Sequence, residues 1–241
     1  PGGVSIYNPE SEGFTRLFSE QFLLENPDLS SVAQILRDQQ DQIWLATNTG
    51  LFLATLQGEL LAHYTVEHGI PHNGIRALLR DKNGEIWVGT RAGLARYSRA
   101  NDVFERVTAN NADVKNLYIR TLFEDDMGQI WIGSNASGLW RFDPESGLLL
   151  QALAEQPEEY QKSTIYDIFQ KDDKEIWAAR FGGIDRIAIK DGRWLSRSIH
   201  DPSDSFSLAN NDIRTMLKDR SGLVWIGGYG GGVQRVLGDQ D

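Results

Sequence analysis

Three arginines share one position of an internal repeat, and their type and spacing fit ligand binding better than any other residues do. Arg76, Arg120 and Arg214 each follow the isoleucine with which a copy of the repeat begins. A guanidinium group binds a carboxylate through two parallel hydrogen bonds. Three such groups near one mouth of a repeat ring would therefore form a positive site on an acidic protein. Ion pairing with neighbouring copies is the alternative, and the sequence favours neither.

The tight turn that follows the tryptophan of each copy carries a different residue each time, and we expect it on the same face as the arginines. Repeat proteins build one asymmetric site by varying such positions on a constant scaffold. Polar groups beside aromatic ones suit a sugar or a peptide. These turn positions, the arginines and the tyrosine that replaces arginine in copy four form the predicted ligand-binding set: Arg76, Arg120, Arg214, Asn48, Arg91, Asn135, Tyr166, Phe181 and Tyr229.

The other residues with metal-binding or nucleophilic potential favour structural roles. His63, His68 and His72 are close in sequence, but a glycine and a proline between them prevent a helix that would align them. Cysteine is absent, which excludes thiolate ligands and thiol nucleophiles. A glycine run at 227–232 lacks the helix and the lysine of a phosphate loop, so it fits a turn. We therefore expect no metal site, no cofactor and no catalytic residue.

Aspartates and a second group of arginines also recur at fixed positions. One aspartate per copy lies six residues before a tryptophan; because these cannot converge on one calcium ion, we expect each to cap a turn. The arginines lie nine or ten residues after the tryptophan, where we expect each to pair with a carboxylate of the next copy. The two series are Asp38, Asp81, Asp125 and Asp219, and Arg96, Arg141, Arg186 and Arg235.

The bulk composition indicates a globular protein with an acidic surface. The chain has 241 residues, of which 40% are hydrophobic and 24% charged, and its net charge is −10. Negative charge repels phosphate backbones, so nucleic acid is not an expected partner. No apolar run reaches the roughly 18 residues of a membrane span. The chain begins inside a strand-like pattern at Pro1, which is typical of a piece excised from a longer protein.

A repeat marked by tryptophan predicts the fold. Trp44, Trp87, Trp131, Trp177 and Trp225 are separated by 43, 44, 46 and 48 residues. The second copy predicts four short strands at 75–80, 85–90, 94–98 and 104–107, joined by turns. Four antiparallel strands per period of about 40–50 residues are typical of a β-propeller blade. We expect each tryptophan to fill the space between adjacent blades.

Glycine three residues before the tryptophan, as at Gly84, should supply a positive φ in the first turn. Asp41 and Lys174 replace it in copies one and four, where we expect a different turn. Helical periodicity is confined to 20–36. The predicted organisation is one propeller region at 1–241, closed as five blades or part of a larger ring, with a half blade at 3–19, blades at 29–64, 73–107, 116–152 and 162–199, and a partial blade at 211–237.

The repeat resembles the two-component regulator propeller repeat. The stretch at 208–236 (LANNDIRTMLKDRSGLVWIGGYGGGVQRV) agrees with that motif almost throughout, and the strand entry at 69–76 (GIPHNGIR) is similar to it. The first and fourth copies depart from it, with Ala46 and Ala179 in place of a glycine and Lys171 in place of the turn aspartate. These departures concern turn geometry.

The resemblance implies a periplasmic sensor region of a bacterial membrane receptor whose output is a histidine kinase or a diguanylate cyclase, for two-component or cyclic-di-GMP signalling. Such a region would be no enzyme itself, would bind a small polar ligand such as a saccharide, and would be joined to the remainder of the receptor, with homodimerisation left open. A protein-interaction scaffold is the alternative. A propeller lyase or glycosidase is a further alternative, for which Asp167 and Glu124 are the strand carboxylates available.

Overall fold

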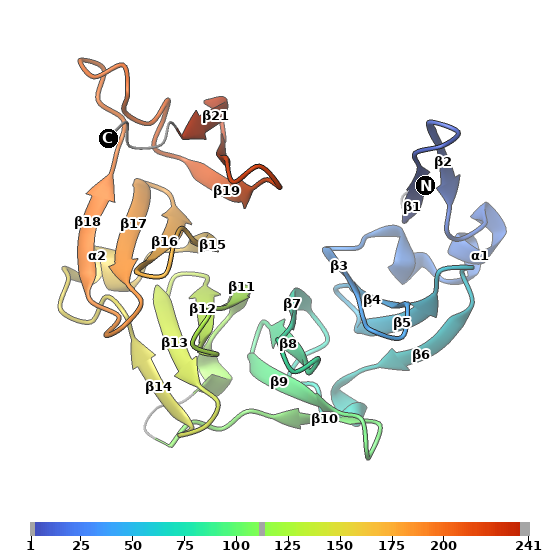
Figure 1. Ribbon diagram of the computed structural model, residues 1–241. Helices are drawn as coiled ribbons and strands as arrows, with labels where there is room; N and C mark the ends of the chain where they lie inside the picture. Colours follow the sequence, from blue (N-terminus) through green and yellow to red (C-terminus); the bar gives the residue numbers. More distant parts are fainter. Residues whose placement is uncertain (1–2, 111–113, 237–241) are drawn as a thin grey trace. The chain divides into compact units, whose positions relative to one another are not determined.

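The computed structural model describes residues 3–110 and 114–236. Over these residues the chain forms six antiparallel sheets with very little helix (Figure 1). Four of these sheets have four strands, one has three and one has two. The predicted all-β propeller architecture, built from four-stranded antiparallel blades, is confirmed.

The first three sheets follow one another along the chain, and each is built from consecutive strands. Their strands are β1 (Ser5–Asn8) and β2 (Gly13–Arg16); β3 (Gln34–Arg37), β4 (Gln42–Ala46), β5 (Leu51–Thr55) and β6 (Leu60–Tyr64); and β7 (Ile75–Arg80), β8 (Ile86–Thr90), β9 (Gly93–Ser98) and β10 (Val103–Arg106). The four strands of the last of these sheets agree with those predicted from the second copy to within one residue at each end.

The next three sheets repeat the same connectivity. Their strands are β11 (Ile119–Glu124), β12 (Ile130–Ser134), β13 (Leu139–Asp143) and β14 (Leu148–Gln151); β15 (Ile165–Gln170), β16 (Glu175–Arg180), β17 (Gly183–Ala188) and β18 (Trp194–Ser198); and β19 (Ile213–Lys218), β20 (Val224–Gly228) and β21 (Gly232–Val236). The partial blade predicted at 211–237 ends at Leu237, which lies outside the described residues.

Short helices lie in the connections. α1 (Glu20–Glu25) and the 3₁₀ turn η1 (Pro27–Ser30) lie in the segment where helical periodicity was predicted. Ser19 caps α1 by accepting a hydrogen bond from the backbone amide of Phe22. α2 (Glu158–Gln161) was not predicted, because a single helical turn shows no periodicity. Two further 3₁₀ turns are η2 (Val66–His68) and η3 (Val114–Asn116).

The chain divides into two compact units. The first unit contains the chain up to Thr108 and also Val114–Asn116. The second unit contains the residues between Thr108 and Val114, and the chain from Leu117 onward. The first unit therefore holds the sheets from β1 to β10, and the second holds those from β11 to β21.

The predicted role of the tryptophans is confirmed within each unit. In the first unit, Trp44 of β4 lies in one hydrophobic cluster with Ile75 and Val88 of the next sheet. In the second unit, Trp131 is clustered with Ile165 and Ile168 of the sheet that follows its own. The indole of one sheet thus fills the space against the next sheet, and sheet-on-sheet packing forms the core.

The turn aspartates cap their hairpins as predicted and also hold the tryptophans, which was not predicted. In the sheet of β11–β14, one carboxylate oxygen of Asp125 accepts from the amides of Met127 and Gln129 at 2.9 and 3.0 Å. The other oxygen accepts from the indole Nε1 of Trp131 at 2.7 Å. The same three bonds recur at Asp38, Asp81 and Asp219. One residue therefore fixes both the turn and the ring.

Replacement of the turn glycine has different outcomes in copies one and four. Asp41 adopts the left-handed conformation that the glycine has elsewhere, with φ 60°, so the expected different turn in copy one is wrong. The turn there keeps the bonds from Asp38 to the amides of Gln40 and Gln42. The backbone of Lys174 is not left-handed, and its turn is capped by Asp172 instead. The expectation holds only for copy four.

Candidate ligand-binding face

The varied turns lie beside the first residues of the inner strands, as predicted. In the second unit the amide of Asn135 donates to the carbonyl of Tyr118, and the amide of Tyr229 donates to the carbonyl of Asp212. In the first unit the amide of Arg91 donates to the carbonyl of Gly74. These bonds attach each of the three turns to the residue immediately before an inner strand, so that turn and strand-start side chains share one end of each of these sheets.

Four predicted residues of the second unit form one group, the arginine–tyrosine cluster of Arg120, Tyr166, Arg214 and Tyr229. The guanidinium carbons of Arg120 and Arg214 lie 5.1 and 4.0 Å from the centre of the Tyr166 ring. The guanidinium carbon of Arg214 also lies 5.9 Å from the ring centre of Tyr229. Cations over aromatic faces are attracted by the ring quadrupole, so Tyr166 holds two positive groups close together.

Asp212 partly neutralises the arginine–tyrosine cluster. Its two carboxylate oxygens lie 2.7 and 2.8 Å from the guanidinium nitrogens of Arg214. This hydrogen bond raises the pKa of Arg214, which therefore stays charged. Within the described part of the chain Arg120 makes no ion pair, so the cluster keeps one uncompensated positive charge beside Tyr166.

Two aromatic rings are exposed to solvent here, that of Tyr229 within the cluster and that of Phe181 beside Asp212. Phe181 and Tyr229 are 69% and 76% exposed, although both lie in short turns next to well-packed strands. Phe181 forms an isolated antiparallel bridge with Asp212, which ties its turn to the start of β19. Asn135 lies in the corresponding turn before β13 and is half-buried. Flat exposed rings beside arginine and amide groups are the groups that bind a sugar or a carboxylated chain.

The remaining predicted residues form a second, smaller group in the first unit. The side-chain oxygen of Asn48 accepts hydrogen bonds from Nη2 of Arg76 at 3.0 Å and from Nη2 of Arg91 at 3.2 Å. Two arginines thus converge on one amide oxygen. Nε of Arg76 is buried and has no hydrogen-bond partner among the described residues. A buried donor without a partner carries a free-energy cost that an acceptor on a ligand would remove.

Among the described residues, Arg76, Arg120 and Arg214 make no ion pair with a carboxylate of a neighbouring sheet. Arg214 pairs with Asp212 two residues before it, Arg76 binds the amide of Asn48, and Arg120 stacks on a tyrosine. The inter-sheet ion pairs that the sequence analysis gave as the alternative are therefore not found among the described residues, and a role of these arginines in ligand binding stays a prediction.

The chain matches known proteins in sequence and in structure. The family described as Two component regulator propeller matches three segments, 69–92, 113–136 and 207–230, which are the three copies that follow the motif most closely. The chain therefore contains three copies of the two-component regulator propeller repeat. Among curated proteins, no sequence match was found.

Two solved structures of extracellular domains are similar to this chain in both fold and sequence. The extracellular domain of a putative one component system from B. thetaiotaomicron is 26% identical, with a TM-score of 0.80 over 98% of this chain and 30% of that one. The extracellular domain of a putative hybrid two component system from the same organism is also 26% identical, with a TM-score of 0.79 over 97% of this chain and 30% of that one. This regulator propeller thus spans about 30% of the length of either domain.

A third structure shares the fold alone. Catalytically inactive virginiamycin B lyase from Staphylococcus aureus, solved with quinupristin, is 13% identical, with a TM-score of 0.70 over 98% of this chain and 74% of that one. No helix in the described ranges of the regulator propeller is long and apolar enough to cross a membrane.

The expected pairing with a carboxylate of the next copy is wrong for Arg96 and Arg186 in the regulator propeller, because their partners lie in the same sheet. Arg96 lies 3.6 Å from Glu105, and Arg186 binds Glu175 through two nitrogens at 2.7 and 2.9 Å. Arg141 does reach the next copy, but its acceptor there is the backbone carbonyl of Ile189 and not a carboxylate. Each of these three arginines is the cross-strand neighbour of a tryptophan. For Arg96 and Arg186, a glutamate on an adjacent strand of the same sheet is within reach of the side chain.

The histidines and the strand carboxylate serve local structure. His63 stacks on Phe52 with ring centres 3.9 Å apart, and Nδ1 of His72 accepts from the amide of Gly74. No group of three metal-ligating side chains occurs in the stretches that the structure describes. Asp167 is largely buried, which raises its pKa, and it accepts from the amide of Met216 and the hydroxyl of Thr215 in the next sheet. It joins two inner strands of the propeller.

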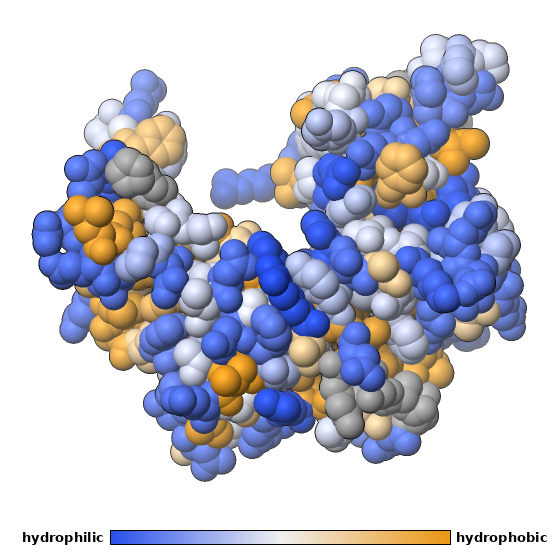
Figure 2. Space-filling model, turned by 180° about the vertical axis from the view of Figure 1, so that it is seen from behind, coloured by the Kyte–Doolittle hydropathy of each residue, from blue (hydrophilic) through white to orange (hydrophobic). Residues whose placement is uncertain are grey.

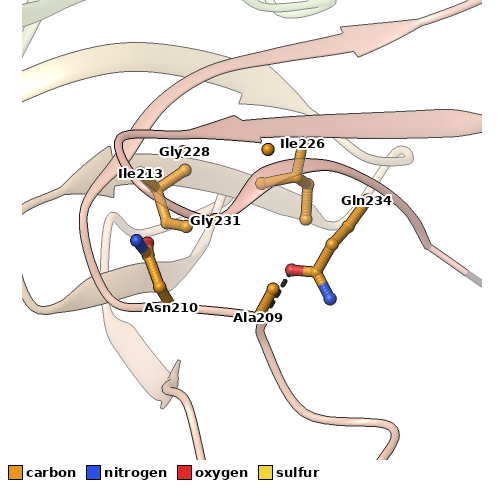
Figure 3. Close-up of a pocket in the computed structure, with 8 residues that line it drawn as sticks. Ala209, Asn210, Ile213, Ile226, Gly228, Gly231 and Gln234 are labelled. Atoms are coloured by element: carbon orange, nitrogen blue, oxygen red, sulfur yellow. Dashed lines mark hydrogen bonds between the residues drawn. The ribbon is translucent and has the colours of Figure 1, made fainter.

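The glycine run forms the turn between β20 and β21, as predicted. Figure 3 shows a small cavity beside it, lined by Asn210, Ile213, Ile226 and Gly231 among others. The side chain of Asn210 donates to the carbonyl of Tyr229, which closes the turn. The cavity has no room for even one water molecule, so it cannot hold a phosphate group.

One buried charged group was missed by the sequence analysis. Asp185 of β17 is fully buried, accepts from Nε of Arg197 at 2.7 Å, and lies 3.6 Å from Nη1 of Arg180. The guanidinium carbons of Arg180 and Arg197 lie 4.9 and 3.8 Å from the centre of the Tyr160 ring, so both cations lie over that ring. Burial and the neighbouring Arg197 lower the pKa of Arg180. These residues are unique to copy four, so no repeated signal could reveal them.

A second missed group joins the first unit's two complete sheets. The hydroxyls of Tyr64 in β6 and Tyr97 in β9 each donate to Oδ1 of Asp102 at 2.6 Å. Burial and this carboxylate raise the pKa of both tyrosines. The hydrogen bonds from Tyr64 and Tyr97 lower the pKa of Asp102.

The lowered pKa of Asp102 predicts a contribution to stability that depends on pH. Because the folded-state pKa is below the unfolded value, the contribution is present above about pH 4 and is lost as pH falls through the folded-state pKa. Asp102→Asn should remove this dependence and lower the melting temperature at pH 7. Melting curves between pH 3 and 7 check it; equal pH profiles for both proteins would contradict it, and Asp28→Asn is the surface control.

Proposed function

We propose that this regulator propeller is part of the extracytoplasmic, ligand-sensing input region of a bacterial signalling receptor. The observation that carries the proposal is the 26% identity over nearly the whole chain to extracellular domains of one-component and hybrid two-component systems. The three matches to the two-component regulator propeller repeat support the same role. A sensor input region fits a non-enzymatic chain, with signal output supplied by another part of the receptor. The periplasm is the compartment that this role implies.

We infer that the ligand is a small polar molecule with a carboxylate, of which an acidic oligosaccharide is the best candidate. The support is the arginine–tyrosine cluster, where Arg120 has no ion pair among the described residues, and the exposed rings of Phe181 and Tyr229. Arginine binds carboxylates bidentately, and sugar rings stack on aromatic faces. The pair of Arg76 and Arg91 on Asn48 in the first unit is a second contact group. Binding would shift the receptor equilibrium by differential affinity.

Variants of the cluster test the site. Arg120→Ala combined with Arg214→Ala should weaken binding of a trigalacturonate probe at least about tenfold, because one bidentate pair is worth about 1.5–3 kcal/mol. Arg76→Ala tests the first-unit group in the same titration. Arg220→Ala is the matched control, since it lies in the turn at the other end of the β19–β20 hairpin. Unchanged affinity in the double variant, with an unchanged melting temperature, would make these arginines structural.

A further inference from the structure

The strand position just before the varied turn carries a small hydroxyl in three copies and an arginine in the fourth. Each hydroxyl is buried and closes its turn by donating to the carbonyl of a glycine three or four residues later, at 2.8, 2.9 and 2.7 Å for Thr47, Thr90 and Ser134. In copy four this position is Arg180, the last residue of β16. It is buried, and its Nε donates to the carbonyl of Phe181 at 3.1 Å. A charged side chain thus closes the one turn of the set that carries a phenylalanine.

Arg180 is held by side chains that have no counterpart in the other copies. Its Nη1 lies 3.6 Å from Oδ2 of Asp185, whose other oxygen binds Arg197 of β18. Both guanidinium groups lie over the ring of Tyr160 in α2. The strand position of Asp185 is a phenylalanine, an alanine, a tryptophan and a glutamine in the other copies. Among the described sheets, only the turn of Phe181 therefore has this charged set beside it.

Stability alone does not account for this charged set. Burial of two guanidinium groups with one carboxylate costs solvation energy, and apolar residues of similar volume are often at least as stabilising. In the other three copies a single hydroxyl closes the turn. A buried ionic group can instead favour one conformation, because its hydrogen bonds are lost in the alternatives. The set therefore fits a role in fixing the conformation of the Phe181 turn.

The backbone of the Phe181 turn is also bonded to the next sheet. The amides of Gly182 and Gly183 both donate to the carbonyl of Asn211, at 2.7 and 2.9 Å. Phe181 itself forms the isolated bridge with Asp212, whose carboxylate binds the arginine–tyrosine cluster. These bonds place the turn directly beside that cluster.

The side chain of Phe181 is exposed although its backbone is fixed. The face of the chain in Figure 2 is mostly hydrophilic, with hydrophobic residues in separate patches. An exposed phenylalanine in a tight turn has no part in the core. A ring whose backbone is already ordered loses little further freedom when a ligand stacks on it. The turn therefore presents a preorganised stacking surface next to groups that bind a carboxylate.

We propose that Arg180 is a positioning residue of the ligand-binding face, which fixes the turn so that the ring of Phe181 stacks on a sugar ring of the ligand. Asp185, Arg197 and Tyr160 keep the arginine in place. The inference rests on the proposed function, because it assigns the carboxylate of the same ligand to the arginine–tyrosine cluster. The ligand class that it names is a sugar ring with an acid group on the ring or on its neighbour.

A double-mutant cycle tests whether Arg180 acts through Phe181. Arg180→Met removes the donor and leaves Asp185 paired with Arg197, so no unpaired charge remains buried. In titration calorimetry with trigalacturonate, the variant should bind at least about tenfold more weakly, the effect of losing roughly one hydrogen bond from a charged group. The double variant with Phe181→Ala should bind no more weakly than Phe181→Ala alone. Additive losses in the double variant would overturn the proposal.

Hydrogen exchange tests the positioning without a ligand, so that failure of this inference is distinguishable from failure of the proposed function. In Arg180→Met the amides of Gly182 and Gly183 should exchange at least about tenfold faster, because their turn has lost a bond. The melting temperature should change by no more than about 3 °C, since the remaining pair is neutral. Arg193→Ala removes the same charge from the surface of the same sheet and should leave exchange and binding unchanged.

The outcomes separate the two proposals. Unchanged exchange of Gly182 and Gly183 in Arg180→Met overturns the positioning role, even where trigalacturonate binds the wild type. A much larger fall in melting temperature also overturns it, because Arg180 would then serve the stability of the whole sheet. A wild-type chain that binds no trigalacturonate contradicts the proposed ligand class and, with it, the stacking role assigned to Phe181.

Discussion

Truncation of Trp131 to alanine is expected to lower the free energy of unfolding by about 3–5 kcal/mol, the range for a large buried ring. Trp131 is fully buried between two sheets, and its Nε1 is held by Asp125. The truncation therefore leaves a cavity and an unpaired buried carboxylate oxygen. Urea unfolding followed by circular dichroism measures the change.

Trp225 is the matched control for that experiment, because it has the same place in its sheet and the same bond to an aspartate, yet is 36% exposed. Trp225→Ala should cost no more than about 2 kcal/mol, since less contact is lost. Equal losses for the two variants would show that burial between sheets is not what makes the repeated tryptophan stabilising.

Replacement of Asp185 by alanine is the second large effect, with an expected loss of about 3–5 kcal/mol, because two guanidinium groups would stay buried without their carboxylate. Asp185 is fully buried and accepts from Nε of Arg197 and from Nε1 of Trp194. Arg180 beside it is itself largely buried. Chemical unfolding at neutral pH measures the loss.

Asp191→Ala is the control for Asp185, since Asp191 faces Arg193 at 3.8 Å on the surface of the same sheet and should change stability by less than about 1 kcal/mol. A triple replacement of Arg180, Asp185 and Arg197 by methionine, leucine and methionine should recover most of the loss, because no charge is then left buried. An Asp185→Ala protein as stable as the wild type would show that the two arginines reach water.

The period of the tryptophans was enough to predict the architecture, because each copy contains the whole pattern of one sheet. Turn chemistry could be predicted where the residue itself sets the backbone, as at Gly84, whose φ is 83°. The prediction of a different turn failed at Asp41. The hydrogen bonds that Asp38 accepts hold the same turn there, although Asp41 has a side chain and glycine has none. Tertiary bonds there outweigh the local cost of a left-handed residue.

The partners of repeated residues were harder to predict than their positions. In copy four Lys171 replaces the aspartate that elsewhere caps the turn and binds the tryptophan. Two other residues make these two kinds of hydrogen bond instead. Asp172 caps the turn, while Glu175 accepts from Nε1 of Trp177 and pairs with Arg186. A spacing of six residues between aspartate and tryptophan, repeated in four copies, was the signal that could have revealed the indole bond. The substitute in copy four has no such signal.

The predicted binding set was correct in placing turns beside strand starts, but the sequence could not sort the set into groups. Contacts show that Arg120, Tyr166 and Arg214 lie together in one unit, and that Asn48, Arg76 and Arg91 lie together in the other. Tyr166, which in copy four takes the position of the repeated arginine, places its ring next to the guanidinium groups of Arg120 and Arg214. Only the spatial neighbourhood of adjacent copies reveals that arrangement.

Titration calorimetry of the wild-type chain tests the central claim most directly, with trigalacturonate as the carboxylated probe and maltotriose as the neutral one. The sensor account predicts saturable binding of one of the two, with trigalacturonate favoured, and chromatography should recover the bound sugar unchanged. Sugar that is cleaved or eliminated during incubation would contradict the account, because the chain would then be an enzyme. Absence of saturable binding by either probe would contradict the proposed ligand class and leave the arginine–tyrosine cluster without its assigned role.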